Sequence, residues 1–322
     1  MPIRCAELLL LLLLAVLAGA SESTLLHASY DPTRAMLTEI NAAFLAGKPG
    51  VTAVRQSHGG SGKQARSVIE GLQADVVSLA LDLDVDQIAL AGLLPRDWKT
   101  RQPGGVSPWT STVVLLVRKG NPKRITGWAD LARPEVIPLV ASPKTSGAAR
   151  LAYLAAWASQ TGDAASVQAF MAGWLKRVPS FDAGARGATM SFTRRGIGDV
   201  LLTWENEAWL AAAESDGACE VVVPAVSILA EPPVAVVEAN ATRHGTLVQA
   251  TAYIAFLATP AVQEIAAKHF YRPRDPAVLA RLVAVFPTLR LLTVEQAFGG
   301  WAEAQKTHFA DGALFDRLIG GG

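Results

Sequence analysis

A glycine-rich turn at residues 58–64, His-Gly-Gly-Ser-Gly-Lys-Gln, constrains this chain more than any other stretch. The run that follows it has apolar residues at helical spacing, so the turn opens a helix. Such a turn leaves backbone N–H groups unpaired at the positive end of the helix dipole, where they bind an oxyanion without any ligating side chain. Residues 145–148 and 182–187 show the same pattern. Three such turns predict a site that surrounds an anion with amides, although each alone could simply join a strand to a helix.

The first turn is not a nucleotide-binding P-loop, despite its Gly-Ser-Gly-Lys sequence. A P-loop has a glycine five residues before the glycine of its Gly-Lys pair and a Ser or Thr after the lysine. Ser57 and Gln64 stand in those two places. The interpretation that remains is an anion site made of amides alone.

Stretches of strand and helix character alternate along the chain, and this rhythm predicts parallel sheets covered by helices. Asp31-Pro32 is a strong helix start, and we expect Leu37, Ile40 and Phe44 to form the buried face of the helix that follows. Proline-bearing connections near 106–112 and 224–234 predict crossings between two α/β lobes. We expect residues 21–110 with 225–322 to form lobe 1 and residues 111–224 to form lobe 2. The ligand of such a protein lies in the cleft, at the carboxyl ends of the strands.

Residues 1–20 have the composition of a signal peptide. Arg4 precedes an apolar run from Leu8 to Leu17, and Ala18-Gly19-Ala20 has the form of a cleavage site. The run is short for a transmembrane anchor, which is the alternative. Cys5 lacks the small residues of a lipoprotein cleavage site before it, so we expect a soluble exported protein cleaved near Ala20.

Charge and cysteine content exclude several classes of function. Removal of residues 1–20 takes away Arg4 and Glu7, so the formal net charge stays +1. Nothing in this balance favours nucleic acid or an anionic membrane surface as a partner. Cys219 then remains alone, so no intramolecular disulfide is expected.

The side chains that could carry chemistry form no catalytic or metal-binding pattern. The five histidines are not spaced as metal ligands, and we expect no metal and no cofactor. Ser61, Ser146, His58 and Asp31 could be combined into a hydrolase-like trio, but no Gly-x-Ser-x-Gly sequence surrounds either serine. Trp204 has an indole that only donates a hydrogen bond, although a lone tryptophan most simply packs in a core.

Taken together, several blocks of sequence resemble the periplasmic sulfate-binding proteins, the sulfate and thiosulfate branch of the solute-binding proteins of ABC importers. The resemblance covers essentially the whole chain after the signal peptide. The blocks are residues 29–34 (SYDPTR), 56–67 (QSHGGSGKQARS), 71–77 (GLQADVV), 182–187 (DAGARG), 195–201 (RGIGDVL), 227–233 (SILAEPP), 271–275 (YRPRD) and 298–301 (FGGW).

The resemblance implies a type II periplasmic binding fold, in which two α/β lobes close over one ligand. It also implies a periplasmic protein that delivers sulfate, with thiosulfate as the nearest variant and molybdate as a more distant one, to the permease subunits of an ABC importer. No enzyme activity, nucleic acid or second copy of the chain is implied, and we expect a monomer. The competing class is an exported enzyme acting on a sulfate or phosphate ester, which would need a nucleophile, acid or metal beside the amides.

When the family's anion contacts are carried over position by position to this sequence, the resemblance implies seven of them. They are the amides of Asp31, Ser61, Gly147, Ala148 and Ala185, the hydroxyl of Ser146 and the indole N–H of Trp204. Supporting residues are Gly60, Gly62, Gly184, Arg186 and His58. The family usually has glycine where Ala148 stands; the alanine N–H keeps the contact if the backbone there is helical.

A site of this kind contains donors and no obligatory acceptor. Sulfate can only accept hydrogen bonds, whereas the proton of monohydrogen phosphate would face another donor. An unsatisfied polar group in a dry cleft costs about 1–3 kcal/mol or more, and about 1.4 kcal/mol is ten-fold in affinity. We therefore expect strong rejection of phosphate and closure of the two lobes around sulfate.

Overall fold

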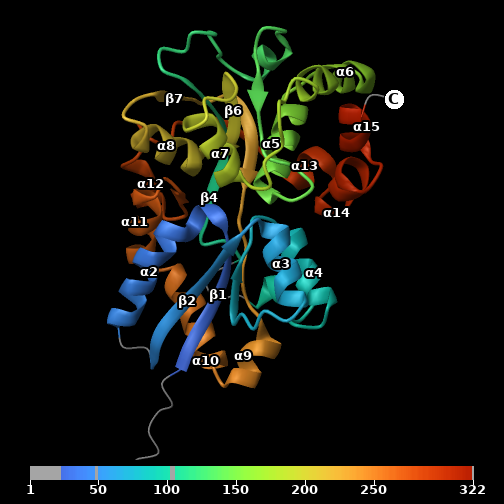
Figure 1. Cartoon of the computed structure of the whole chain (residues 1–322). Coiled ribbons are helices and arrows are strands. Elements are labelled where there is room, and N and C mark those ends of the chain that lie inside the picture. Colours follow the sequence, from blue (N-terminus) through green and yellow to red (C-terminus); the bar gives the residue numbers. More distant parts are fainter. Residues whose placement is uncertain (1–22, 48–49, 102–105, 321–322) are drawn as a thin grey trace, which may run out of the picture.

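The computed structural model describes residues 23–47, 50–101 and 106–320, which form two α/β lobes stacked end to end (Figure 1). The predicted signal peptide lies outside these residues. Within the described ranges, no helix has both the length and the apolar character needed to cross a membrane. The predicted two-lobed α/β architecture is confirmed.

Lobe 1 contains a four-stranded sheet in the order β2-β1-β3-β9. β1 pairs with β2 and β3 in parallel, and β9 is antiparallel to β3. The strands are β1 (Ser23–Tyr30), β2 (Val51–Gly59), β3 (Val76–Ser78) and β9 (Val234–Val236). The helices around this sheet are α2 (Arg34–Ala46), α3 (Ser61–Ile69), α4 (Asp82–Leu90), α9 (Glu238–His244), α10 (Leu247–Leu257) and α11 (Pro260–Lys268).

The helix predicted after Asp31-Pro32 begins with a 3-10 turn, η1 (Asp31–Thr33), that continues into α2. Leu37, Ile40 and Phe44 are buried, as their spacing predicts. The helix ends at Ala46, before Gly47. The sequence therefore sets both the start and the buried face of this helix.

Lobe 2 contains a seven-stranded sheet with the path β11-β8-β4-β6-β5, and β7 and β10 also pair with β4. The strands are β4 (Trp109–Arg118), β5 (Pro138–Leu139), β6 (Val200–Trp204), β7 (Cys219–Val222), β8 (Val226–Ala230), β10 (Arg272–Pro273) and β11 (Arg290–Leu292). The helices of lobe 2 are α5 (Gly147–Ala158), α6 (Ala164–Leu175), α7 (Ala185–Thr193), α8 (Glu205–Glu214), α12 (Pro276–Ala280), α13 (Val294–Phe298), α14 (Trp301–Ala304) and α15 (Leu314–Gly320). Lobe 2 also contains the 3-10 helix η3 (Trp128–Ala132) and the π-helix η4 (Gln305–Phe309), and lobe 1 contains the 3-10 helix η2 (Trp98–Thr100).

β4 is the central strand of lobe 2, and residues 109–117 are all buried. It is antiparallel to β6, β7, β8 and β10. Both sheets are thus mixed. The predicted parallel pairing is confirmed for β1 with β2 and β3, but it does not hold for β4 of lobe 2 or for β9. The alternation of strands and helices could not show this, because β4 and β9 follow crossings between the lobes and return in the opposite direction.

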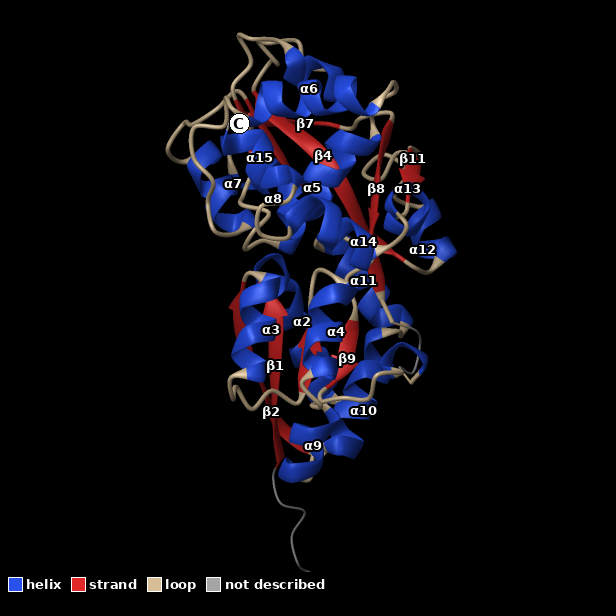
Figure 2. Ribbon diagram, turned by 90° about the vertical axis from the view of Figure 1, so that its right-hand side faces the viewer, coloured by secondary structure: helices blue, strands red, loops and turns tan. Residues whose placement is uncertain are grey.

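The predicted lobe boundaries differ from this pairing in the C-terminal part. β8 and β11 belong to the sheet of lobe 2, although residues 225–322 were expected in lobe 1. The chain also crosses between lobes near Phe270, in addition to the crossings predicted near 106–112 and 224–234 (Figure 2). Gln263 joins two of the crossings, since its Nε2 donates to the Pro108 carbonyl at 2.9 Å and its Oε1 accepts from the Arg274 amide at 2.6 Å.

Candidate anion-binding site

Four helix N-termini meet between the lobes. η1 and α3 begin in lobe 1 at Asp31 and Ser61, and α5 and α7 begin in lobe 2 at Gly147 and Ala185. The first N–H groups of each helix have no partner within the helix. The three turns singled out in the sequence therefore lie together, and a fourth N-terminus at Asp31 joins them.

These N-termini enclose a small cavity of about 10 Å³. Its lining is formed by Tyr30, Asp31, Pro32, Gly59, Gly60, Ser61, Ala80, Ser146, Gly147, Ala148 and Ala185. No lysine, arginine or histidine is among these described lining residues. The positive potential inside the cavity comes from backbone amides and helix ends.

The Ser61 side chain is already engaged on both sides. Its hydroxyl donates to the carboxylate of Asp84 in α4, and its oxygen accepts from the Ala80 amide at 2.9 Å. Ser61 can therefore offer the cavity its backbone N–H but not its hydroxyl proton. Burial raises the pKa of the Asp84 carboxyl, and the Ser61 hydroxyl and the charges of Arg150 and Arg66 oppose this rise.

Arg150 of lobe 2 lies close to the Asp84 carboxylate. It lies on α5, its Nη1 is 4.0 Å from Asp84 Oδ1, and both side chains are largely buried. Its Nε donates to the Pro143 carbonyl at 2.9 Å. Asp84 and Arg150 thus form a contact across the cleft beside the cavity, and neither was found in the sequence.

Ser146 differs from Ser61 in the hydrogen bonds of its side chain. Its oxygen caps α5 by accepting from the Ala149 amide at 3.3 Å, so its own proton is free to point into the cavity. Ala148 follows within the regular helix, and it is not among the described residues with positive φ. The helical backbone that its N–H contact requires is therefore present.

Trp204 is fully buried at the end of β6, where it precedes α8. Trp204 is not among the residues that line the cavity. Its ring centroid lies 5.5 Å from that of Tyr30, which does line the cavity. Within the described part of the chain, the indole nitrogen has no hydrogen-bond partner. The indole N–H is therefore available to an acceptor. The next residue, Glu205, accepts two hydrogen bonds from Arg272, at 2.6 and 2.8 Å, which fixes the start of α8.

The Asp31 carboxyl lies at the mouth of the cavity, facing lobe 2. A Cβ added at Gly184, the residue before α7, would lie 3.4 Å from Asp31 Oδ2. Burial raises the pKa of the Asp31 carboxyl, and the positive charges of Arg34 and Lys63 oppose this rise. The two cations limit the repulsion between this carboxylate and a bound anion.

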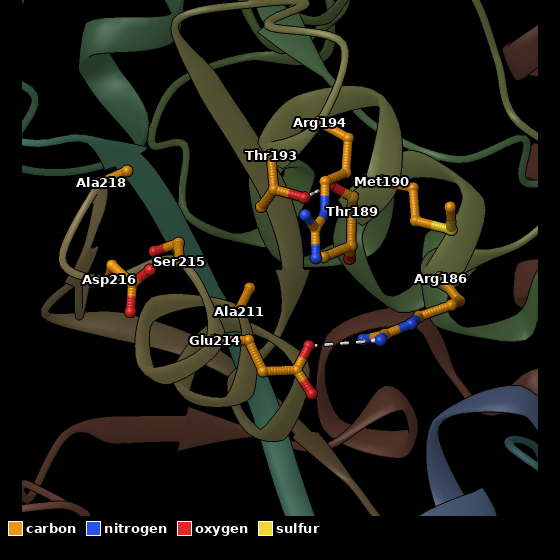
Figure 3. Close-up of a pocket in the computed structure, with 10 residues that line it drawn as sticks. All are labelled: Arg186, Thr189, Met190, Thr193, Arg194, Ala211, Glu214, Ser215, Asp216 and Ala218. Atoms are coloured by element: carbon orange, nitrogen blue, oxygen red, sulfur yellow. Dashed lines mark hydrogen bonds and ion pairs between the residues drawn. The ribbon is translucent and has the colours of Figure 1, made fainter.

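The remaining supporting residues take separate positions. Gly62 lies in the first turn of α3. His58 bonds through Nε2 to Gln56 Oε1 at 2.6 Å, and burial lowers its pKa to about 4. Arg186 does not line the cavity; it lies in a neighbouring pocket between α7 and α8, where it pairs with Glu214 at 3.3 Å (Figure 3).

The described residues contain no group of three or more histidine, cysteine or acidic side chains that could hold a metal. The hydrolase-like trio is also not assembled through hydrogen bonds. Ser61 bonds to Asp84, and His58 bonds to Gln56. Cys219 is buried and unpaired.

Two α/β lobes with a small cavity between facing helix N-termini define a two-lobed ligand-binding protein. The comparisons agree. The chain belongs to the family of bacterial extracellular solute-binding proteins, whose profile matches residues 25–272. The family resemblance stated from the sequence is confirmed.

Three relatives are similar over most of their length. A sulfate-binding protein of Escherichia coli K12 is 49% identical over 95% of this chain and 96% of its own. A thiosulfate-binding protein of Pseudomonas aeruginosa PAO1 is 45% identical over 94% of each chain. The solved structure of the sulfate-binding protein SubI from Mycobacterium tuberculosis H37Rv aligns with a TM-score of 0.81 at 32% identity, covering 89% of this chain and 99% of that one.

Proposed function

We propose that this protein captures sulfate in the cavity between its lobes and delivers it to the permease subunits of an ABC importer. The observation that carries the proposal is the cavity lining: helix N-termini from both lobes, and no basic side chain. Sulfate is a dianion that only accepts hydrogen bonds, so it matches a wall made of donors.

The donors divide between the lobes. The amides of Asp31 and Ser61 belong to lobe 1. The amides of Gly147, Ala148 and Ala185, the Ser146 hydroxyl and the Trp204 indole belong to lobe 2. An anion that accepts from both sets stabilises the closed form by differential contacts, and the importer recognises that form.

The same site is unsuited to an enzyme. A sulfate- or phosphate-ester hydrolase needs an activated nucleophile or a metal next to the anion. The hydroxyl of Ser61 is bonded to a carboxylate, and the oxygen of Ser146 serves as a helix cap. These contacts support a protein that binds its ligand without turnover. We further propose that it works in the periplasm as an exported monomer cleaved near Ala20.

Calorimetric titration of the protein from residue 21 onward with sulfate tests the proposal. We expect saturable binding with one site. Thiosulfate is the second candidate, because a relative named for thiosulfate is 45% identical. Binding of thiosulfate alone would assign it as the ligand, and hydrolysis of aryl sulfate or aryl phosphate esters would contradict the binding role.

A further inference from the structure

Lys144 joins the sulfate-binding turn of lobe 2 to the C-terminal part of the chain. It lies two residues before Ser146. Its ammonium donates to the carbonyls of Phe309 at 3.1 Å and Ala310 at 3.2 Å, and to the Asp316 carboxylate at 2.7 Å. The exposed Asp311 lies at 3.3 Å. One side chain therefore binds two backbone carbonyls and a carboxylate that are 165–172 residues away in sequence.

A positively charged side chain is favourable at the position that the Lys144 ammonium occupies. Phe309 ends the π-helix η4, and cations stabilise the unpaired carbonyls at the end of a helix. A second hydrogen bond also fixes Asp316, because its carboxylate accepts from the Gly312 amide at 2.8 Å. Lys144 thus contacts acceptors whose positions are already fixed.

The C-terminal segment that Lys144 contacts packs along α5. Tyr153 of α5 is 3.2 Å from His308 Nδ1, and its ring lies 5.2 Å from Phe309 and 6.0 Å from Phe315. α15 packs against α6 and η4 in lobe 2 (Figure 1). The helix that presents Gly147 and Ala148 to the cavity is therefore supported by the last residues of the chain.

Two further hydrogen bonds connect this turn and the residues before it to the turn that precedes α7. The Thr145 hydroxyl donates to the Ala183 carbonyl at 2.8 Å, which ties the turn to the start of α7. The Ser142 amide donates to the Asp182 carbonyl at 2.8 Å. These bonds link the two anion-binding turns of lobe 2 to one another, whereas Lys144 links the pair to the C-terminal segment.

We propose that Lys144 is a positioning residue: it anchors the turn that carries Ser146, Gly147 and Ala148 on the C-terminal segment and so holds the lobe 2 donors in the geometry that binds sulfate. This inference rests on the proposed function. Without the anchor, the turn samples other geometries, and part of the binding free energy is lost in ordering it again.

Lys144→Met tests the inference, because it keeps the aliphatic stem and removes the donors. We expect about ten-fold weaker sulfate binding by calorimetry, since bonds to a charged group contribute on this scale. In stopped-flow fluorescence the loss falls on the dissociation rate. Lys144→Arg restores part of the affinity. Asp316→Asn weakens binding less than Lys144→Met, and adding it to Lys144→Met causes little further loss.

Lys268→Met is the matched control, because it removes a lysine paired with Glu39 at 2.9 Å on the surface of lobe 1. Its sulfate affinity stays at the wild-type value. The proposal is overturned if Lys144→Met is folded, as judged by circular dichroism, and binds sulfate within two-fold of wild type. A wild-type protein that binds no sulfate contradicts the proposed function instead, so the two failures are distinguishable.

Discussion

Gly60 of lobe 1 lies against the backbone of Thr145 in lobe 2, so closely that a Cβ added to Gly60 would be 2.9 Å from the Thr145 carbonyl oxygen. Gly147 makes the reciprocal contact, since its added Cβ would lie 2.9 Å from Ala80 Cβ and 3.0 Å from Leu81 Cγ. Glycine is needed at both positions because the lobes approach with no room for a side chain. Gly147, chosen in the sequence for its amide, and Gly60, named there as a supporting residue, thus also permit closure.

Gly60→Ala should hinder closure. The clash is with backbone of the opposite lobe, which cannot move aside without separating the lobes, so we expect sulfate affinity to fall at least ten-fold. Small-angle scattering should show a larger radius for this variant than for wild type at saturating sulfate. Gly62→Ala is the control, because its nearest atom would be Asp84 Oδ1 at an ordinary 3.6 Å. Wild-type compaction in Gly60→Ala would contradict this role.

Trp204→Phe should weaken sulfate binding by about 10- to 100-fold. The change removes one donor to a charged acceptor, worth about 1.5–3 kcal/mol, and keeps an aromatic ring next to Tyr30. Calorimetry measures the affinity directly. An unchanged affinity would mean that the indole N–H, which has no partner among the described residues, does not contact the ligand.

Asp84→Ala should lower both stability and affinity. It leaves the Ser61 hydroxyl without its acceptor and the buried Arg150 without its carboxylate. Breaking a buried pair by removing one partner costs about 3–5 kcal/mol, and Asp84→Asn, which keeps an acceptor for Ser61, should cost less. Urea unfolding measures the effect. Asp97→Ala removes an exposed carboxylate paired with Arg101 and should change the unfolding free energy little. Equal stabilities for Asp84→Ala and wild type would exclude this contact.

His27 should make the protein less stable as the pH falls. It is buried between Ser78 Oγ at 2.7 Å and Tyr253 Oη at 3.2 Å, and burial, with a smaller contribution from His58, lowers its pKa from 6.5 to about 3. Below pH 6.5 the unfolded chain binds a proton that folded His27 does not. Its stabilising contribution is complete above pH 6.5 and is lost toward pH 3, by about 1.4 kcal/mol per pH unit.

His27→Gln isolates this contribution from that of buried acids such as Asp84 and Glu207, whose raised pKa values act in the opposite direction. The variant lacks the titrating group, so the gap in unfolding free energy between it and wild type should narrow as the pH falls from 6.5 to 5. Chemical denaturation at several pH values measures the gap. A gap that does not change with pH would show that His27 is protonated equally in both states.

The sequence was sufficient to predict the parts of the site that depend on local backbone. A glycine turn before an apolar helical pattern shows where a helix begins, and so the turns at residues 58–64, 145–148 and 182–187 could be chosen before their positions in space were known. The family resemblance then named Ser61, Gly147 and Ala185 within them. Leu37, Ile40 and Phe44 were predicted as buried for the same reason, because their spacing is a local property.

The parts that depend on distant contacts could not be predicted. Asp84, Arg150 and Lys144 gain their roles from partners 23 to 172 residues away, and no local pattern marks them. The antiparallel direction of β4 and the place of β11 in lobe 2 follow from how often the chain crosses between lobes. Arg186 was named as a supporting residue of the site, but its side chain pairs with Glu214 instead.

Parallel titrations with sulfate and with phosphate at mildly alkaline pH, followed by calorimetry, test the central claim most directly. At that pH phosphate is mainly the monohydrogen dianion, which has the charge of sulfate and differs in carrying a proton. A cavity whose anion contacts are all donors predicts tight binding of sulfate and phosphate binding weaker by at least a hundred-fold, because the phosphate proton meets a donor. Similar affinities for the two anions would contradict the account, since they would require an acceptor for the phosphate proton, and the Asp31 carboxylate at the mouth of the cavity would be the candidate.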